Sequence, residues 1–230
     1  MARKTFFVTG TDTGVGKTLV TRVLLEAARL QGLKTLAMKP VASGCEQTAD
    51  GLRNEDAVLL AAAMTERVPY EQVNPVALAP AIAPHVAAQQ AGRRLTAERL
   101  AGFCRGMQTQ PADLLLVEGA GGWCVPLNDR ETYAKVPQLL ELPVIMVVPL
   151  RLGCINHAVL TARAVLADGV PLAGWVGNRP DAQTMSCEAQ TVSYLADQLP
   201  APCLGLLPWQ PSVDVTALAA QVSLDPLLLG

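Results

Sequence analysis

The stretch Gly10-Thr11-Asp12-Thr13-Gly14-Val15-Gly16-Lys17-Thr18 lies between the apolar run Phe6-Phe7-Val8 and a long amphipathic segment. Its glycines allow the backbone to curl with several N–H groups pointing inward. Lys17 is placed to reach the β- and γ-phosphates of a nucleotide, and the Thr18 hydroxyl to ligate Mg²⁺ at a helix start, where the dipole favours anions. The first glycine of the usual pattern comes one residue early here, at Gly10. The stretch predicts a phosphate-binding loop; the alternative, an ordinary glycine-rich turn capping a helix, does not explain why strand, loop, Lys-Thr and helix arrive in order.

Apolar runs of strand length alternate with amphipathic segments of helix length along the whole chain. This alternation predicts an α/β fold, namely a single-domain P-loop fold over residues 1–230 with a mostly parallel, doubly wound sheet and helices on both faces. The predicted strands are 4–9, 34–39, 113–118, 144–149, 172–177 and 203–207. The predicted helices are 17–31, 55–64, 96–107, 157–168 and 184–198. Four prolines interrupt the segment 69–95, which we interpret as an excursion from the domain rather than a linker.

Composition restricts the class of protein. Of the 230 residues, 50% are hydrophobic and 17% charged, as expected of a compact domain. The formal net charge is −2 and Lys/Arg runs are absent, which argues against nucleic acid or an anionic membrane as the main partner. The sequence contains neither a secretory h-region nor an apolar run of the ~18 residues that span a bilayer, so we expect a cytoplasmic protein. Six cysteines without a C-x-x-C pair, and two isolated histidines, support neither a zinc site nor a disulfide framework.

Polar residues follow the predicted strands, and in an open α/β sheet such residues meet at one crevice. Lys39 and Ser43 follow the second strand and would bring an ammonium and a hydroxyl beside the phosphates. Asp56 begins a helix, where it could either hold a metal or simply complement the helix dipole. Glu118 ends a buried strand, where a carboxylate is costly unless a cation meets it; Mg²⁺ and a lysine are the two candidates. The crevice is thus predicted to handle heavily anionic chemistry.

Two further turns are candidates for binding. Asn156 is expected to cap the helix that follows strand 144–149, and the free N–H groups of its first turn suit a carboxylate or a phosphate. The alternative is a helix that its own Asn caps and that binds nothing. The turn Asn178-Arg179-Pro180-Asp181 could contact a nucleotide base, or be only a turn. It also resembles the Asn-Lys-x-Asp turn of GTPases, so Asp181 is a candidate for reading guanine, although we favour ATP.

Five motifs together resemble the dethiobiotin synthetase family of biotin synthesis, in order and in spacing. The match covers nearly the whole chain and weakens after Trp209. The motifs are the phosphate loop, Lys39-Pro40-Val41-Ala42-Ser43-Gly44, Val117-Glu118-Gly119-Ala120-Gly121-Gly122, Leu152-Gly153-Cys154-Ile155-Asn156-His157 and Ala173-Gly174-Trp175-Val176.

The resemblance implies an ATP- and Mg²⁺-dependent ring closure in which 7,8-diaminononanoate and CO₂ become dethiobiotin, through a carbamate and a carbamic-phosphoric anhydride. It implies catalytic roles for Lys17 and Lys39, and a homodimer in which the turn from Gly153 to Asn156 of one subunit receives the substrate carboxylate of the other. The implied nucleotide contacts are Gly14, Val15, Gly16, Lys17, Thr18, Leu19, Asp56, Glu118, Gly119, Ala120, Gly121, Asn178, Arg179, Pro208, Trp209 and Gln210. The implied metal ligands are Thr18, Asp56 and Glu118, and the implied substrate contacts are Thr13, Ser43, Gly153, Cys154, Ile155 and Asn156.

Two other protein classes share parts of this pattern. Switch ATPases of the partition or septum-positioning type bind a protein partner, but they carry a signature lysine early in the loop, where this chain has Asp12. The amidation module of corrin-ring synthases has a similar loop, but those chains continue into a glutaminase region for which 230 residues leave no room. Both are less favoured than the synthetase.

Overall fold

A sheet of six parallel strands, in the order β10-β9-β8-β1-β7-β2, forms the centre of the molecule. The computed structural model describes residues 3–228. The strands of this sheet are β1 (Lys4–Gly10), β2 (Thr35–Met38), β7 (Leu114–Glu118), β8 (Val144–Pro149), β9 (Leu172–Asn178) and β10 (Cys203–Leu207). Each of the six predicted strands is confirmed to within one residue, because a continuously apolar run is typical of a strand buried on both faces.

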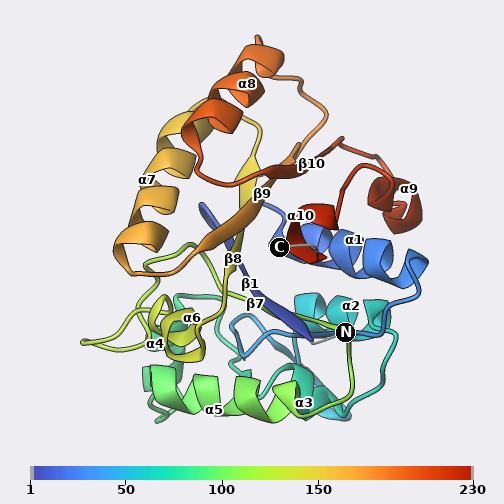
Figure 1. Cartoon of the computed structure of the whole chain (residues 1–230). Helices are drawn as coiled ribbons and strands as arrows, with labels where there is room; N and C mark the ends of the chain where they lie inside the picture. The colour runs from blue at the N-terminus through green and yellow to red at the C-terminus, as the bar shows by residue number, and fades with distance from the viewer. Residues whose placement is uncertain (1–2, 229–230) are drawn as a thin grey trace.

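Helices cover both faces of the sheet. Figure 1 shows α1 with α2 and α9 on one side, and α5, α6 and α7 on the other. The helices are α1 (Lys17–Leu30), α2 (Glu55–Ala63), α3 (Tyr70–Val73), α4 (Pro84–Gln90), α5 (Ala97–Gln108), α6 (Lys135–Leu140), α7 (Cys154–Ala167), α8 (Glu188–Gln198), α9 (Val215–Ala219) and α10 (Asp225–Leu228). No helix within residues 3–228 combines the length and the apolar character needed to cross a membrane.

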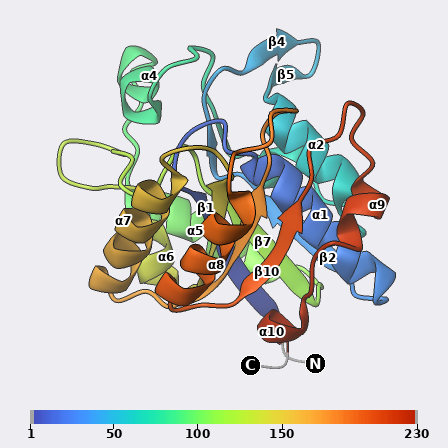
Figure 2. The ribbon, with the colours of Figure 1, turned by 90° about the horizontal axis from the view of Figure 1, so that it is seen from above.

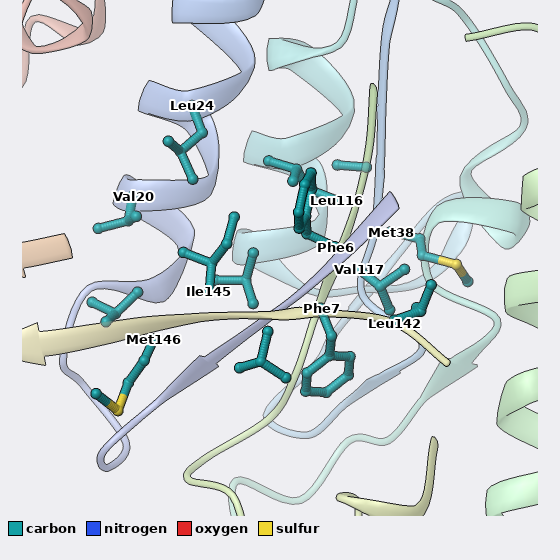
Figure 3. Close-up of a cluster of buried hydrophobic side chains, with 14 of the residues drawn as sticks. Phe6, Phe7, Val20, Leu24, Met38, Leu116, Val117, Leu142, Ile145 and Met146 are labelled. Atoms are coloured by element: carbon teal, nitrogen blue, oxygen red, sulfur yellow. The ribbon is translucent and has the colours of Figure 1, made fainter. Parts of the chain in front are cut away.

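The buried face of α1 packs on the central strands. Figure 3 shows Val20 and Leu24 of α1 beside Leu116 of β7 and Ile145 of β8, and all four side chains are fully buried. The predicted helices 17–31, 55–64 and 96–107 are likewise confirmed to within one residue. In 17–31 and 96–107 the apolar residues recur at i, i+3 and i+4, which fixes both the element and the face that it buries.

The predicted starts of two helices are wrong. We expected Asn156 to cap a helix beginning at residue 157, but α7 begins at Cys154, behind Gly153 with φ +93°. Glycine adopts this left-handed conformation without a Cβ clash, so the chain enters the helix one turn earlier than the preference of Asn for capping suggests. Similarly, α8 begins at Glu188 rather than at residue 184, because Cys187 has φ +56° and cannot continue a helix.

The proline-rich segment 69–95 is an excursion, as predicted, and contains only short elements. The short strands are β3 (Val41–Ala42), which pairs with β6 (Val76–Ala77), and β4 (Glu46–Thr48), which pairs with β5 (Gly51–Arg53). Figure 2 shows α4 and the β4–β5 hairpin rising above the edge toward which β10 points. Since the sheet is parallel, this is the carboxyl edge of all six strands. The chain runs from β1 to β2 on one side of β1, and later from β7 to β8 on its other side. Such a switch point is where α/β sheets bind ligands.

Candidate active site

The loop after β1 is folded as a phosphate cradle. Gly14 and Gly16 have φ of +73° and +91°, and a Cβ added to Gly16 would come within 2.2 Å of Asn178 Nδ2. Gly14 is therefore required by its left-handed backbone conformation, and Gly16 both by its conformation and by the lack of room for a Cβ. Helix α1 begins at Lys17 without a side-chain cap, so the N–H groups of its first turn remain available to an anion.

The Lys17 side chain lies between the phosphate loop and the loop that follows β7. Its ammonium donates hydrogen bonds to the carbonyl oxygens of Asp12 at 3.0 Å and of Gly121 at 2.7 Å. Burial, together with the positive charge of Lys39, lowers the pKa of Lys17 from 10.5 to about 8. The negative charge of an anion in the loop would favour the ammonium form and so raise the pKa of Lys17 again.

Nucleotide binding is expected to take up a proton at alkaline pH. The pKa of Lys17 is about 8 in the free protein, so most Lys17 side chains are neutral at pH 9 and recharge when phosphates arrive. The number of protons taken up per nucleotide bound should approach about one at pH 9 and be only about 0.1 at pH 7. Titration calorimetry in buffers of different ionisation enthalpy measures it. Lys17→Arg is the control, because arginine stays charged at both pH values; equal uptake in this variant would assign the proton to another group.

Lys39, Asp56 and Glu118 form one charged cluster at the carboxyl ends of β2 and β7. The Lys39 ammonium lies 2.7 Å from Asp56 Oδ2 and 2.7 Å from Glu118 Oε1. Glu118 Oε1 also accepts a hydrogen bond from the Thr18 hydroxyl at 2.8 Å. Glu118 is completely buried and Lys39 nearly so, whereas Asp56 is half-exposed toward the cavity. Side chains from four separate elements thus converge on one point.

The charges in this cluster stabilise one another. Burial opposes the charged form of Lys39, but the two carboxylates outweigh it and the pKa of Lys39 is raised. Burial also opposes ionisation of Asp56, but Lys39 outweighs it and lowers the pKa of that carboxyl. Lys39 and Asp56 therefore stay charged around neutral pH.

Thr18, Asp56 and Glu118 fit a magnesium ion. All three offer hard oxygen ligands, and the Lys39 ammonium already demonstrates that a cation fits between the two carboxylates. No group of three or more His, Cys, Asp or Glu side chains suited to a metal occurs in residues 3–228. A site with only two carboxylates is typical of Mg²⁺ that completes its shell with water and nucleotide phosphates.

A cavity of about 690 Å³ opens above the cluster. Its polar end is formed by the phosphate loop, Lys17, Thr18, Lys39, Asp56 and the predicted substrate contacts Thr13 and Ser43. Its remaining wall is largely apolar and consists of Ala42, Ala81, Ile82, Ala83, Pro84, Ala120 and Val125. Two parts of this cavity were not predicted from the sequence: the wall at residues 81–84, which leads into α4, and Asn54, which caps α2. The Ser/Thr/Asp/Asn preference at helix starts could have identified Asn54.

A second cavity, of about 220 Å³, lies on the other side of the loop. It brings together the predicted nucleotide contacts Gly14, Gly16, Leu19, Asn178, Arg179, Pro208, Trp209 and Gln210. Asn178 is buried, and its Nδ2 donates to Val15 O at 2.9 Å. Its Oδ1 is buried as well and meets no donor among residues 3–228. Because a buried acceptor normally has a donor, the exocyclic amine of a nucleotide base is a suitable partner for this oxygen.

Val15, Glu118 and Gly119 are predicted nucleotide contacts that line neither cavity. The Val15 side chain is buried, and only its carbonyl oxygen is used, by Asn178. Gly119 packs against the Phe7 ring and donates its N–H to Val8 O at 2.9 Å. Asp181, the candidate for reading guanine, is exposed and accepts the N–H of Gln183 at 2.9 Å. It does not line the base cavity, so the similarity to a GTPase turn is local.

The turn from Gly153 to Asn156 lies near the phosphate loop without lining either cavity. Arg151 reaches Asp12 across a distance of 3.7 Å. Cys154, the first residue of α7, donates its N–H to Arg151 O at 3.0 Å. Asn156 and Leu152 point to solvent, and Leu152 is 94% exposed.

Comparison with known proteins identifies the family. The family model described as "AAA domain" matches residues 4–217. The chain is 66% identical to the ATP-dependent dethiobiotin synthetase of Marinobacter nauticus, over 97% of this chain and 95% of that protein. It is 58% identical to the synthetase of the same name from Cellvibrio japonicus, over 99% of both chains. This chain belongs to the dethiobiotin synthetase family.

Solved structures with a similar fold are more distant from this synthetase. A chain of the MinC:MinD cell division protein complex from Aquifex aeolicus aligns with a TM-score of 0.58 at 18% identity, over 94% of this chain and 86% of that one. The signal recognition particle receptor FtsY of Elizabethkingia anophelis, in complex with GDP, aligns with a TM-score of 0.54 at 15% identity, over 99% of this chain and 64% of that one. At such identities the similarity establishes the P-loop α/β fold alone.

Proposed function

We propose that this enzyme uses ATP and Mg²⁺ to convert 7,8-diaminononanoate and CO₂ into dethiobiotin, the cyclic urea of biotin synthesis. The observation that carries the proposal is the convergence of Lys17, Lys39 and Asp56 beside a phosphate loop, at the polar end of a cavity whose other wall is apolar. The fully buried Glu118 lies behind them, paired with Lys39. The 54–66% identity to several curated dethiobiotin synthetases supports the same reaction.

The charges of the site match the charges of the reaction. An amine captures CO₂ as a carbamate, the carbamate oxygen attacks the γ-phosphorus and ADP leaves. The second amine then attacks the carbonyl carbon of the carbamic-phosphoric anhydride, and phosphate leaves as the ring closes. Negative charge gathers at every step, so stabilisation by fixed cations and positioning of the amines supply the catalysis.

Each polar side chain has a role in this scheme. Lys17 neutralises charge on the β- and γ-phosphates. Lys39 neutralises charge on the carbamate and on the phosphoryl group during its transfer. Thr18, Asp56 and Glu118 would hold Mg²⁺, which supplies further charge neutralisation on the phosphates. Ser43 and Thr13 line the cavity where the amines would lie, and the wall from Ala81 to Pro84 suits an aliphatic chain.

The substrate carboxylate requires a second subunit in this proposal. The N–H groups of Ile155 and Asn156 and the exposed Leu152 lie outside the cavities of the single chain, as a contact made to a partner would. Sedimentation of the active enzyme should therefore give a dimer. A fully active monomer would contradict the shared site.

The direct test of the reaction is incubation with diaminononanoate, bicarbonate and Mg-ATP, followed by mass detection of the product. Labelled bicarbonate should appear in the ureido carbon of dethiobiotin, together with one ADP and one phosphate. ATP hydrolysis without this product would favour a switch ATPase.

ATP should be used with a kcat/KM about 10–100-fold above that of GTP. Asn178 Nδ2 is held by Val15, so its unpaired Oδ1 is the atom left to meet the base. The exocyclic amine of adenine or cytosine can donate to that oxygen, whereas guanine O6 is itself an acceptor. Parallel kcat/KM measurements with ATP, CTP and GTP check this order. Asp181→Ala is the matched control and should change none of the three values; a selective loss of GTP use would place Asp181 in the pocket after all.

A further inference from the structure

Thr21 is a buried residue of α1 that contacts the carboxylate at the centre of the charged cluster. Its Oγ1 lies 3.0 Å from Glu118 Oε2 and 2.9 Å from Lys17 O, and the residue has no exposed surface. It lies one helical turn after Thr18, whose hydroxyl contacts the other oxygen of Glu118. Two hydroxyls on one face of α1 therefore bracket a single carboxylate.

The Thr21 hydroxyl donates its hydrogen bond to the Glu118 carboxylate. A hydroxyl has one proton to donate, and two acceptors compete for it. In a regular helix Lys17 O already accepts the backbone N–H four residues later, and a carboxylate is the stronger acceptor. Glu118 Oε2 has no other partner among the hydrogen bonds of residues 3–228, whereas Oε1 is shared by Thr18 and Lys39. Thr21 is thus the group that satisfies the buried Oε2.

We propose that Thr21 is a positioning residue for the metal site: it holds Glu118 Oε2, so that Oε1 faces Thr18 and Lys39 and can bind a divalent cation. The inference rests on the metal assignment made in the proposed function. Without the Thr21 hydroxyl, Oε2 would be buried without a donor, and rotation of the carboxylate toward Lys39 would relieve that loss. Such a rotation would withdraw Oε1 from the metal. Groups that orient metal ligands in this way affect metal affinity without touching the ion.

The test measures metal affinity rather than turnover. Thr21→Val has nearly the same shape and lacks only the hydroxyl, and Thr21→Ser retains it. The dissociation constant of Mn²⁺, measured by electron paramagnetic resonance in the presence of ADP, should rise about 10–100-fold in Thr21→Val and stay within about threefold of the wild type in Thr21→Ser. The affinity for ADP without metal should be unchanged in both.

Thr35→Val is the matched control. Thr35 is equally buried, but its hydroxyl accepts the N–H of Thr65 instead of contacting the cluster, so this variant should lose stability and keep its Mn²⁺ affinity. If Thr21→Val does not fold, Thr21→Cys, with a weaker donor, should give an intermediate dissociation constant. A Thr21 variant without the hydroxyl that binds Mn²⁺ as the wild type does would overturn the inference, even if its melting temperature falls. Failure of the wild type itself to bind Mn²⁺ with ADP would instead overturn the metal assignment.

Discussion

Glu118→Gln should lower turnover about 10²–10³-fold while the protein stays folded. Glutamine has the same shape and still offers Oε1 to Thr18 and Lys39, but it removes the charge from the fully buried carboxylate. A neutral oxygen binds Mg²⁺ far more weakly than a carboxylate does. Initial rates across a range of Mg²⁺ concentrations, with ATP fixed, provide the measurement.

The appropriate control for this change is Glu98→Gln. Glu98 pairs with Arg105 on the exposed face of α5 and should be replaceable without effect on rate. Full activity of Glu118→Gln at limiting Mg²⁺ would mean that Glu118 is a structural partner of Lys39 and not a metal ligand. Circular dichroism on both variants separates a loss of the site from a loss of the fold.

Lys39→Met should lower kcat/KM about 10²–10³-fold and leave the affinity for ATP within about threefold. The interaction of Lys39 should strengthen as charge develops on the carbamate and the transferring phosphoryl group, so its loss should affect the transition state more than the bound nucleotide. Equal losses in ATP affinity and in turnover would instead make Lys39 a nucleotide clamp.

The same variant should also depend on metal for its stability. Removing Lys39 leaves Glu118 buried without its cation, which costs about 3–5 kcal/mol in such pairs, whereas the half-exposed Asp56 contributes less. Because Mg²⁺ and the Lys39 ammonium neutralise the same carboxylates, Mg²⁺ should raise the melting temperature of Lys39→Met more than that of the wild type. Lys34→Met, which removes an exposed ion pair with Glu66, should show no such difference. Equal Mg²⁺ responses would argue that the metal is not held by these two carboxylates.

Much of this molecule follows from local sequence. Continuous apolar runs such as Val144–Pro149 indicate strands buried on both faces, and the i, i+3, i+4 spacing of apolar residues in α1 fixes its inward face. The phosphate loop is equally local, because Gly14, Gly16 and Lys17 act through the backbone conformation of a few consecutive residues. The resemblance to the dethiobiotin synthetase family, confirmed by the relatives, also follows from local sequence, since five spaced motifs are far more specific than one.

Only the tertiary structure decided how distant residues combine. The bridge of Lys39 between Asp56 and Glu118 joins residues that are 17 and 79 positions from it, and the contact of Thr21 with Glu118 joins residues 97 positions apart. Which side-chain atom of Asn178 is left for a base depends on Val15, which is 163 positions away and accepts the Nδ2 hydrogen bond. Asp181 fits a sequence pattern yet turns to solvent. Helix and strand periods arise between near neighbours, whereas hydrogen bonds and ion pairs require two atoms within about 3 Å, and sequence spacing cannot fix that distance across separate elements.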